Sequence, residues 1–327
     1  MNTPQRVVAL GGGTGLPNVL RGFRTLLRRG HLADVVAVVT MTDDGGSSGR
    51  LRRSRGLPPA GDLRNCLVAL AAEEDLMSRL FQHRYGGTEE LGGHSVGNLI
   101  LAALAEQTGS FFEAVELSSR VLRVVGLILP VTRDTVSLEA TMEDGSTVVG
   151  ETRIAASGKG IRRVSLRPSP ARPAPGVLEA LARADLVVLG PGSLYTSIVP
   201  NLLVQGIAPA LRDTSAVVVL VANLVSEPGE TAGLDLPAHL QVVERHAGGR
   251  FVDAVVVHRG PIDDRAVARY EADGSHPLTW PETSEAAVPI YRKNLLADDF
   301  KIRHDPVLTV EAAVEAWREA RRTEKVR

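Results

Sequence analysis

The sequence predicts an α/β protein built on a doubly wound, mainly parallel sheet, and three observations carry this prediction. Short apolar runs rich in β-branched residues recur at 7–10, 35–41, 186–189, 217–222 and 252–257. Such runs are typical of strands buried on both faces of a parallel sheet. The first two runs each end in a glycine-rich turn, and in open α/β sheets ligands bind just outside the carboxyl ends of the strands. The sequence therefore predicts where a ligand binds, and these observations do not indicate a reaction.

Length and composition are those of an ordinary globular protein. The 327 residues are 44% hydrophobic and 23% charged, with a net charge of -1. We expect one α/β domain over 1–327, with a β-rich insertion at 130–170 and a C-terminal segment at 261–327 that ends in a helix. The near-zero charge provides no global attraction to nucleic acid or membranes. Few aromatic residues, 4% of the chain, argue against stacking on single-stranded nucleic acid.

Several features predict a cytoplasmic protein without membrane insertion. Cys66 is the only cysteine, so no disulfide forms within the chain. Gly11–Gly13 interrupts the first apolar run, which is unlike a signal peptide, and no run of about 18 apolar residues predicts a membrane span. No cluster of Cys and His indicates zinc. We also expect the protein to form a homo-oligomer.

The first predicted unit is a strand, a glycine turn, a helix and a second strand. Residues 16–29 carry apolar side chains at the spacing of one helical face. The crossover between the two parallel strands should be right-handed. Three further helices should each follow a capping residue: Leu63 to about Glu74 after Asp62, Val96 to about Gln107 after Ser95, and Phe111 to about Val124 after Ser110.

A change of composition marks the predicted insertion. Residues 131–151 are rich in Thr and Val, with Asp144-Gly145 as a hairpin turn, and 161–166 is another short strand. The proline-rich stretch 168–175 should be a stiff connector. The α/β alternation then resumes, with helices expected at 174–183, 201–212 and 309–322. Because the β-rich block breaks the alternation, a doubly wound sheet is favoured over a (β/α)8 barrel.

The first glycine turn, Gly11-Gly12-Gly13-Thr14-Gly15, precedes a helix, so its amides should face an anion at the positive end of that helix. One charge at an exposed helix N-terminus contributes only about 0.3–1 kcal/mol. Micromolar binding needs roughly 8 kcal/mol, so other groups must contribute. Leu16 stands where the dinucleotide fingerprint has its last glycine, and no Walker A Gly-Lys-Ser/Thr follows. A tight turn without a ligand is the alternative.

The second turn runs from Thr42 to Arg50 and contains two acids, two glycines and two serines before the arginine. The adjacent carboxylates of Asp43 and Asp44 could hold Mg²⁺ through oxygen ligands. They could also accept hydrogen bonds from a ribose or a base, although they lie further along than the usual ribose-binding acid of a Rossmann unit. A helix cap or a loop acid is the structural alternative.

Further polar clusters open later helices or follow later strands. Asp62, Arg64 and Asn65 begin one helix, with an N-cap role as the alternative for Asp62, and His94 and Asn98 flank the start of another. The segment 190–197 lacks the G-x-S-x-G of a nucleophile elbow, and its amides and hydroxyls suit a phosphate or a sugar. The loop from Asn223 to Thr231 is either a mobile lid or a connector.

Five of these segments together resemble the gluconeogenesis factor family (YvcK-like) of the CofD-like phospholactate transferase superfamily: 11–16, 42–50, 62–65, 94–98 and 190–202. The resemblance extends from about Val7 to His258, and 294–306 is similar as well. It implies a CofD-like Rossmann-type fold and a nucleotide-sugar ligand such as UDP-N-acetylglucosamine. It also implies a regulatory role in carbon metabolism, peptidoglycan precursor supply and cell shape, with no established reaction.

The expected ligand-binding residues combine the resemblance with the residue patterns, and no catalytic residue is assigned. They are Gly12, Gly13, Thr14, Gly15, Asp43, Asp44, Gly45, Gly46, Ser47, Arg50, Asp62, Arg64, Asn65, His94, Asn98, Gly192, Ser193, Leu194, Tyr195, Thr196 and Asn223. No cofactor is firmly implied. The rival hypothesis is a phospholactyl-type transferase that uses a nucleotide-linked donor and holds Mg²⁺ with Asp43 and Asp44. A third hypothesis, a nicotinamide-binding protein, rests on the Rossmann-like start alone.

Overall fold

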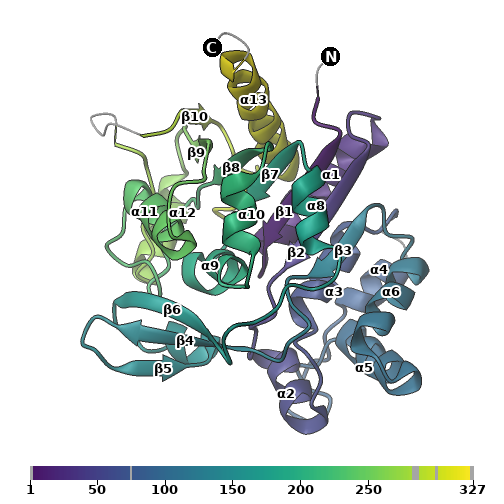
Figure 1. Cartoon of the computed structure of the whole chain (residues 1–327). Helices are drawn as coiled ribbons and strands as arrows, with labels where there is room; N and C mark the ends of the chain where they lie inside the picture. Colours follow the sequence, from purple (N-terminus) through teal and green to yellow (C-terminus); the bar gives the residue numbers. More distant parts are fainter. Residues whose placement is uncertain (1–2, 74–75, 282–286, 299–300, 325–327) are drawn as a thin grey trace.

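A computed structural model describes residues 3–73, 76–281, 287–298 and 301–324. Within these residues, a seven-stranded parallel sheet has helices on both of its faces (Figure 1). Its strand order is β10-β9-β8-β7-β1-β2-β3. The strands are β1 Arg6–Gly11, β2 Asp34–Val39, β3 Leu127–Pro130, β7 Leu186–Leu189, β8 Val217–Val221, β9 Ala254–His258 and β10 Ile290–Lys293. The predicted doubly wound sheet is confirmed.

The order of the strands places a topological switch point between β1 and β7. From β1 the chain moves outward to β2 and β3, and it later returns to the other side of β1, where β7 to β10 follow in sequence. On one side Val7 pairs with Val35, and on the other it pairs with Leu186, both in parallel register. Loops at the carboxyl ends of β1 and β7 therefore diverge from a common edge, where open α/β sheets bind their ligands.

The helices shield the buried strands, and the C-terminal helix completes the core. Helix α13 (Pro306–Glu324) packs against α1 (Gly15–Arg28), β8 and β9. A Cβ on Gly22 of α1 would lie 2.1 Å from the carbonyl oxygen of Pro306, so only glycine allows this approach. The other main-domain helices are α2 Gly46–Arg55, α3 Gly61–Ala69, α4 Leu76–Gln82, α5 Val96–Thr108, α6 Phe111–Val121, α8 Val177–Arg183, the π-helical turn η1 Leu194–Ile198, α9 Val199–Leu202, α10 Ile207–Asp213, α11 Leu236–Ala247 and α12 Asp264–Ala272.

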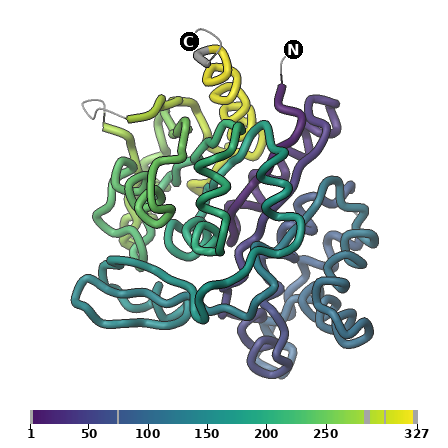
Figure 2. Tube along the Cα trace, viewed as in Figure 1, coloured from purple at the N-terminus to yellow at the C-terminus, as the bar shows by residue number. Residues whose placement is uncertain are grey.

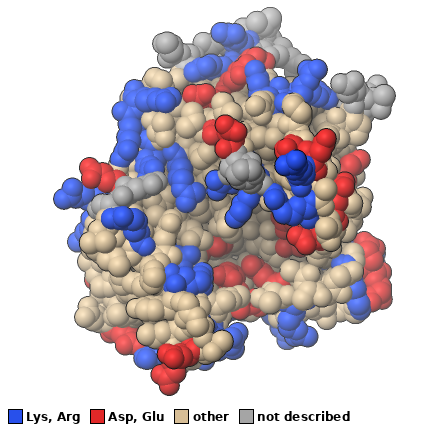
Figure 3. Space-filling view, turned by 180° about the vertical axis from the view of Figure 1, so that it is seen from behind, with Lys and Arg blue, Asp and Glu red and all other residues tan. Residues whose placement is uncertain are grey.

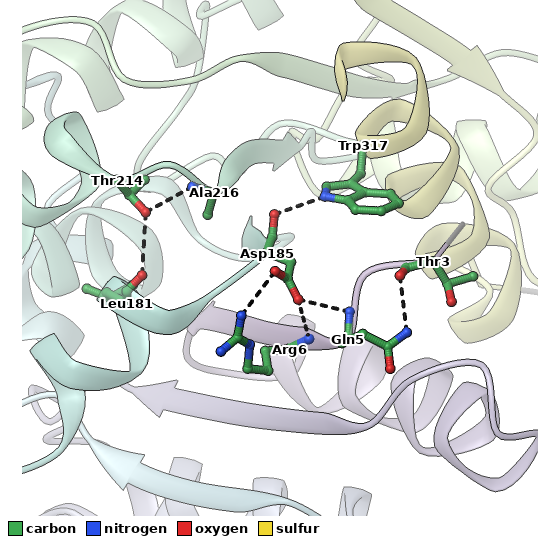
Figure 4. A network of polar contacts seen from close by, with 8 residues as sticks. All are labelled: Thr3, Gln5, Arg6, Leu181, Asp185, Thr214, Ala216 and Trp317. Atoms are coloured by element: carbon green, nitrogen blue, oxygen red, sulfur yellow. Dashed lines mark hydrogen bonds and ion pairs between the residues drawn. The ribbon is translucent and has the colours of Figure 1, made fainter. Parts of the chain in front are cut away.

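Asp185 joins three elements at the amino-terminal edge of the sheet (Figure 4). Its carboxylate accepts hydrogen bonds from the backbone amides of Gln5 and Arg6 at 3.0 and 2.9 Å. Its backbone carbonyl accepts a 2.9 Å hydrogen bond from the Trp317 indole. These bonds fix β1, β7 and α13 at the edge opposite the glycine turns. This edge therefore contributes to the stability of the fold.

The predicted insertion forms a separate antiparallel sheet in the order β5-β4-β6. Its strands are β4 Ser137–Met142, β5 Thr147–Val149 and β6 Ile161–Arg167, and the short helix α7 Glu151–Ala155 lies between β5 and β6. The hairpin turn predicted at Asp144-Gly145 joins β4 and β5. Figure 2 shows the first and last described residues at the edge of the molecule away from this insertion.

Several helix boundaries differ from the prediction. Asp62 lies inside the first turn of α3, where Ala60 is the N-cap residue, so its predicted capping role is wrong. Helix α3 ends at Ala69 because Ala71 bridges to Val124, and the expected end near Glu74 lies outside the described residues. The helix predicted over 201–212 is broken by Gly206 at φ +85°. The predicted caps Ser95 and Ser110 are confirmed, since each side chain accepts a backbone amide.

Among the described residues, no single helix combines the length and apolarity that a membrane crossing requires. The segments Leu194–Leu202 and Ile207–Asp213 reach that threshold only when they are taken together, and they meet at 77°.

Candidate functional site

A cavity of about 410 Å³ opens at the switch point, beyond the carboxyl ends of β1, β7 and β8. Five stretches of chain meet around it: the first glycine turn with the start of α1, Asn65 of α3, the segment after β7, the loop after β8, and residues 302–304. Figure 3 shows the molecule from behind, with a hollow near its centre and both acidic and basic side chains around it. The lining residues are Gly13, Thr14, Gly15, Pro17, Asn18, Arg21, Asn65, Pro191, Gly192, Ser193, Ser197, Asn223, Leu224, Val225, Glu227, Ile302, Arg303 and His304.

The first glycine turn presents the N-terminus of α1 to this cavity. The side chain of Thr14, the N-cap residue, makes no capping hydrogen bond, and the first turn of the helix carries no acidic residue. No carboxylate of the first turn therefore balances the positive end of the helix dipole, and this end of the helix suits an anionic ligand. The Gly13 amide donates a 2.7 Å hydrogen bond to Asp62 Oδ2. The backbone of Gly13 has a φ of +59°, which favours glycine at this position.

Glycine is required where the two glycine loops meet. A Cβ on Gly15 would lie 2.0 Å from the carbonyl oxygen of Pro191, and one on Gly12 would lie 2.3 Å from Thr40 Cγ2. Real Cβ atoms do not approach other heavy atoms so closely, so a side chain on Gly15 would force the loops after β1 and β7 apart, and one on Gly12 would displace Thr40 after β2. Gly15 thus allows the loops after β1 and β7 to come into contact.

Asn223 joins the loop after β7 to the loop after β8. Its Oδ1 accepts the Gly192 amide at 3.0 Å, and its Nδ2 donates to the Gly192 carbonyl at 2.9 Å. Ser193 hydrogen-bonds the carboxyl of Glu227, whose pKa is raised because it is buried. Serine, asparagine and a carboxyl that protonates readily together offer donors and acceptors for hydroxyl groups.

Three acids with raised pKa values hold segments near the cavity. Burial raises the pKa of Asp62 to about 6 and that of Glu230 to about 7. Glu230 accepts hydrogen bonds from the Tyr195 amide at 3.1 Å and from the Thr196 hydroxyl at 2.7 Å. Glu151 of the insertion accepts a hydrogen bond from the Thr42 hydroxyl, and burial raises its pKa well above the usual value. Sequence reasoning missed both glutamates because no motif marks them.

The structure brings one third of the predicted site residues to the cavity wall. These are Gly13, Thr14, Gly15, Asn65, Gly192, Ser193 and Asn223. Gly12 lies beside them and Asp62 holds Gly13. The cavity also has contributors that the motifs did not indicate, among them Asn18, Arg21 and His304. The Asn18 side chain donates to the His304 carbonyl at 2.8 Å, which holds the late segment against α1.

The Asp-Asp-Gly-Gly turn makes contacts within the protein. Asp43 accepts the Gly45 amide at 2.9 Å, and Asp44 Oδ1 accepts the Thr152 amide and hydroxyl at 3.0 and 2.8 Å. Gly46 begins α2. Ser47 hydrogen-bonds His94 Nδ1 at 3.0 Å, and Arg50 donates to the Gly92 carbonyl at 2.7 Å. This turn therefore ties the insertion and the loop before α5 to the sheet, outside the cavity wall.

The remaining predicted residues are mostly buried. Arg64 donates to the Ser95 hydroxyl and to Asn65, and the Asn98 side-chain oxygen is buried without a hydrogen-bond partner. Leu194 and Tyr195 point into the core, and the Tyr195 hydroxyl donates to the Ile161 carbonyl of β6 at 3.1 Å. Thr196 contacts Glu230. The side chains of these residues support the loops and do not line the cavity.

Within the described residues, no group of three or more His, Cys, Asp or Glu side chains is arranged to hold a metal ion. Asp43 and Asp44 share no third ligand of that kind. Because Mg²⁺ in proteins is often held by one or two carboxylates together with waters and phosphates, the Mg²⁺ site at Asp43 and Asp44 stays a prediction.

The switch-point geometry defines a class of protein: a Rossmann-type fold with a polar pocket in which helix amides, asparagines and arginines can hold an anion. Comparison with known sequences makes this specific. The chain belongs to the family described as 2-phospho-L-lactate transferase CofD, whose model matches residues 7–296.

Relatives over nearly the whole chain carry a different name. A gluconeogenesis factor from Halalkalibacterium halodurans is 42% identical over 93% of this chain and 92% of its own length. A gluconeogenesis factor from Bacillus subtilis is 41% identical over 93% of this chain and 96% of its own length. A crystal structure of a Bacillus halodurans protein superposes with a TM-score of 0.90 at 42% identity, covering 94% of this chain and 99% of the other.

Proposed function

We propose that the protein binds a nucleotide sugar of the uridine diphosphate type in the switch-point cavity and acts as a cytoplasmic regulator. One observation carries the proposal: separate segments of the chain converge on the N-terminus of α1, where the N-cap side chain of Thr14 makes no capping hydrogen bond. A pyrophosphate is the anion that such a helix end and its neighbouring glycine amides favour. The volume of about 410 Å³ is within the range of small-molecule pockets.

The lining residues suggest an orientation for the ligand. The pyrophosphate would lie against the amides of Thr14 and Gly15, with Arg21 and Arg303 on the same wall. Sugar hydroxyls would contact Ser193, Asn223 and Glu227. Because burial raises the pKa of Glu227, its carboxyl can donate a proton in a hydrogen bond and repels a nearby phosphate less.

The regulatory part of the proposal rests on the relatives. The two reported above are named gluconeogenesis factors, which supports a role in carbon metabolism. A nucleotide sugar is also a precursor of peptidoglycan, so binding would let the protein respond to precursor supply and, through it, influence cell shape. We propose no catalytic residue for this function.

Calorimetric titration with UDP-N-acetylglucosamine tests the proposal. Thr14→Glu puts a carboxylate at the amides of α1, where it favours the helix but repels a pyrophosphate. We expect saturable binding to the natural protein and at least roughly tenfold weaker binding to Thr14→Glu, equal to about 1.4 kcal/mol. Ser54→Glu adds the same charge on the exposed face of α2 and should bind normally. Absence of heat with any UDP-sugar would end the proposal.

The family description supports a second candidate, a transferase of phosphoryl-linked groups. Asp43 is the side chain to test, because its carboxylate lies near Asp62 and Glu151 and could take part in positioning a donor. Turnover of a nucleotide-linked phosphate donor that requires Mg²⁺ and is lost in Asp43→Asn would favour this candidate. Binding without turnover, and without competition from NAD, would favour the regulator.

A further inference from the structure

A second cavity lies between the insertion and α11, and arginines line it. Its volume is about 370 Å³, and its wall consists of Arg162, Arg163, Arg245 and His246. None of these residues lines the switch-point cavity. Three guanidinium groups that share one cavity repel one another unless an anion lies between them.

A β-bulge explains how two consecutive residues of β6 both reach this cavity. Thr141 pairs with Arg163 while Met142 pairs with Ile161, so Arg162 is an extra residue in the strand. Strand side chains normally alternate between faces, and a bulge re-aims them. Arg162 and Arg163 are therefore both exposed, between the buried residues Ile161 and Val164.

Helix α11 supplies the opposite wall and fixes its distance from β6. His246 Nδ1 donates to the Val242 carbonyl at 2.7 Å, and Nε2 accepts the Val164 amide at 3.2 Å. Nδ1 is thus held by its own helix, and Nε2 holds the edge of β6. Arg245 donates to the Arg162 carbonyl at 3.4 Å, which turns its side chain toward the strand.

The arginines of this cavity differ from other cations of the insertion, which form ion pairs with carboxylates. Lys159 pairs with Asp144 at 2.6 Å, and Arg167 pairs with Glu139 at 3.1 Å. Among the described residues, Arg162, Arg163 and Arg245 form no ion pair with a carboxylate. Positive charge therefore gathers in this cavity without an ion pair to a carboxylate of the described residues.

We propose that this arginine cavity is a second ligand site, which binds a small phosphorylated molecule carrying more than one negative charge. Guanidinium groups recognise phosphate oxygens through paired N–H donors. A cavity of about 370 Å³ admits a small organic phosphate and is too confined for a folded partner. The site is independent of the nucleotide-sugar proposal, because it shares no lining residue with the first cavity.

The test uses pyrophosphate as the probe, in the Thr14→Glu background, so that the switch-point cavity does not contribute. Calorimetry should give one saturable site per chain. The double change Arg162→Gln and Arg163→Gln should weaken it at least tenfold. Arg153→Gln removes an exposed arginine of α7 in the same insertion and should leave the affinity unchanged.

Three results would refute the proposal that the arginine cavity is a ligand site. One is the absence of pyrophosphate binding in the Thr14→Glu protein. Another is binding that the double arginine change leaves intact, which would locate the anion elsewhere. The last is retention on vesicles of anionic lipid that the double change abolishes, without binding of pyrophosphate, which would assign the arginines to a membrane surface. Circular dichroism of each variant checks that these exposed substitutions leave the fold intact.

Discussion

At the scale of single residues, the glycines of the first turn determine how closely the loops approach. Gly15→Ala would place a Cβ 2.0 Å from the Pro191 carbonyl, a backbone atom that cannot rotate away. We expect a loss of about 3 kcal/mol of folding free energy or more, seen as a lower melting temperature. Gly86→Ala is the matched control, since its Cβ would meet no atom within 4 Å. Equal melting temperatures for the two variants would contradict the described packing of the loops.

Glu230 predicts a pH dependence of stability. Burial raises its pKa from 4.5 to about 7, so between these values the folded state binds more protons than the unfolded state. Its contribution is fully present below pH 4.5 and is lost as the pH rises through about 7. Glu230→Gln cannot lose a proton, so its stability relative to the natural protein should increase by about 3 kcal/mol between pH 4.5 and pH 8.

Urea unfolding of both proteins at pH 4.5, 6 and 8 measures this difference. Glu89→Gln, at an exposed position, is the control and should give a difference that is constant with pH. A constant difference for Glu230→Gln would mean that the carboxyl ionises normally and is not held in a dry environment. His304 has the opposite sign, because burial lowers its pKa to about 4, so the comparison must be made between variants and not on one protein.

The residues of the site were only partly predictable. Gly13, Gly15 and Gly192 could be identified because a glycine beside a strand end has few other purposes. Glu151 and Glu230 could not, since a single acid in a polar stretch resembles a solvated surface residue until its burial is known. Arg50 was expected at the phosphates, but it donates to the Gly92 carbonyl, a contact that depends on a loop more than 40 residues away.

At the scale of secondary-structure elements, α7 connects the insertion to the turn after β2. Asp44 accepts the amide and the hydroxyl of Thr152, so a residue of that turn caps a helix of the insertion. Asp44→Ala removes this cap and should cost about 1 kcal/mol. Hydrogen exchange should become faster in residues 151–155, while the strands of the main sheet keep their protection. Asp34→Ala, at the exposed start of β2, is the control.

Equal protection of 151–155 in both variants would show that α7 does not depend on Asp44. The same contact explains why the role of the Asp-Asp pair was open from sequence. A carboxylate at a strand end caps a helix as readily as it binds a ligand, and only the position of the insertion distinguishes the two.

The elements themselves were predicted well where periodicity was strong. Five of the seven strands of the main sheet follow apolar runs, and α5 and α6 begin where their caps predict. Helix α1 begins within one residue of the start that its apolar spacing predicts. Strands β3 and β10 were missed because each has only four residues and is only partly buried. β3 ends in a proline, and half of β10 is charged. The segment 201–212 has a helical pattern, but Gly206 takes a left-handed conformation and divides it.

At the scale of the whole molecule, the sheet order accounts for the position of the site. The order in which strands are added to the sheet reverses between β1 and β7, although the two strands are parallel. The loops after these strands therefore leave the sheet edge toward opposite sides. A crevice at this point follows from topology, and glycine makes it deep enough for a ligand. Residues 302–304 complete the wall. Sequence patterns could not place them there, because their position depends on how α13 packs against α1.

The whole molecule should also respond thermodynamically to its ligand. A ligand at one hundred times its dissociation constant adds about 2.7 kcal/mol of apparent stability. The melting temperature should therefore rise with UDP-N-acetylglucosamine for the natural protein and for Ser54→Glu, and by about half as much or less for Thr14→Glu, whose affinity is at least roughly tenfold lower. A similar rise for all three proteins would place the ligand away from the N-terminus of α1.

A crystal structure of the protein with UDP-N-acetylglucosamine would locate the proposed ligand. We predict a pyrophosphate within hydrogen-bond distance of the Thr14 and Gly15 amides, with the sugar beside Ser193 and Asn223. A complex in which the nucleotide sugar occupies any other surface, with the switch-point cavity left to solvent, would refute the proposed site.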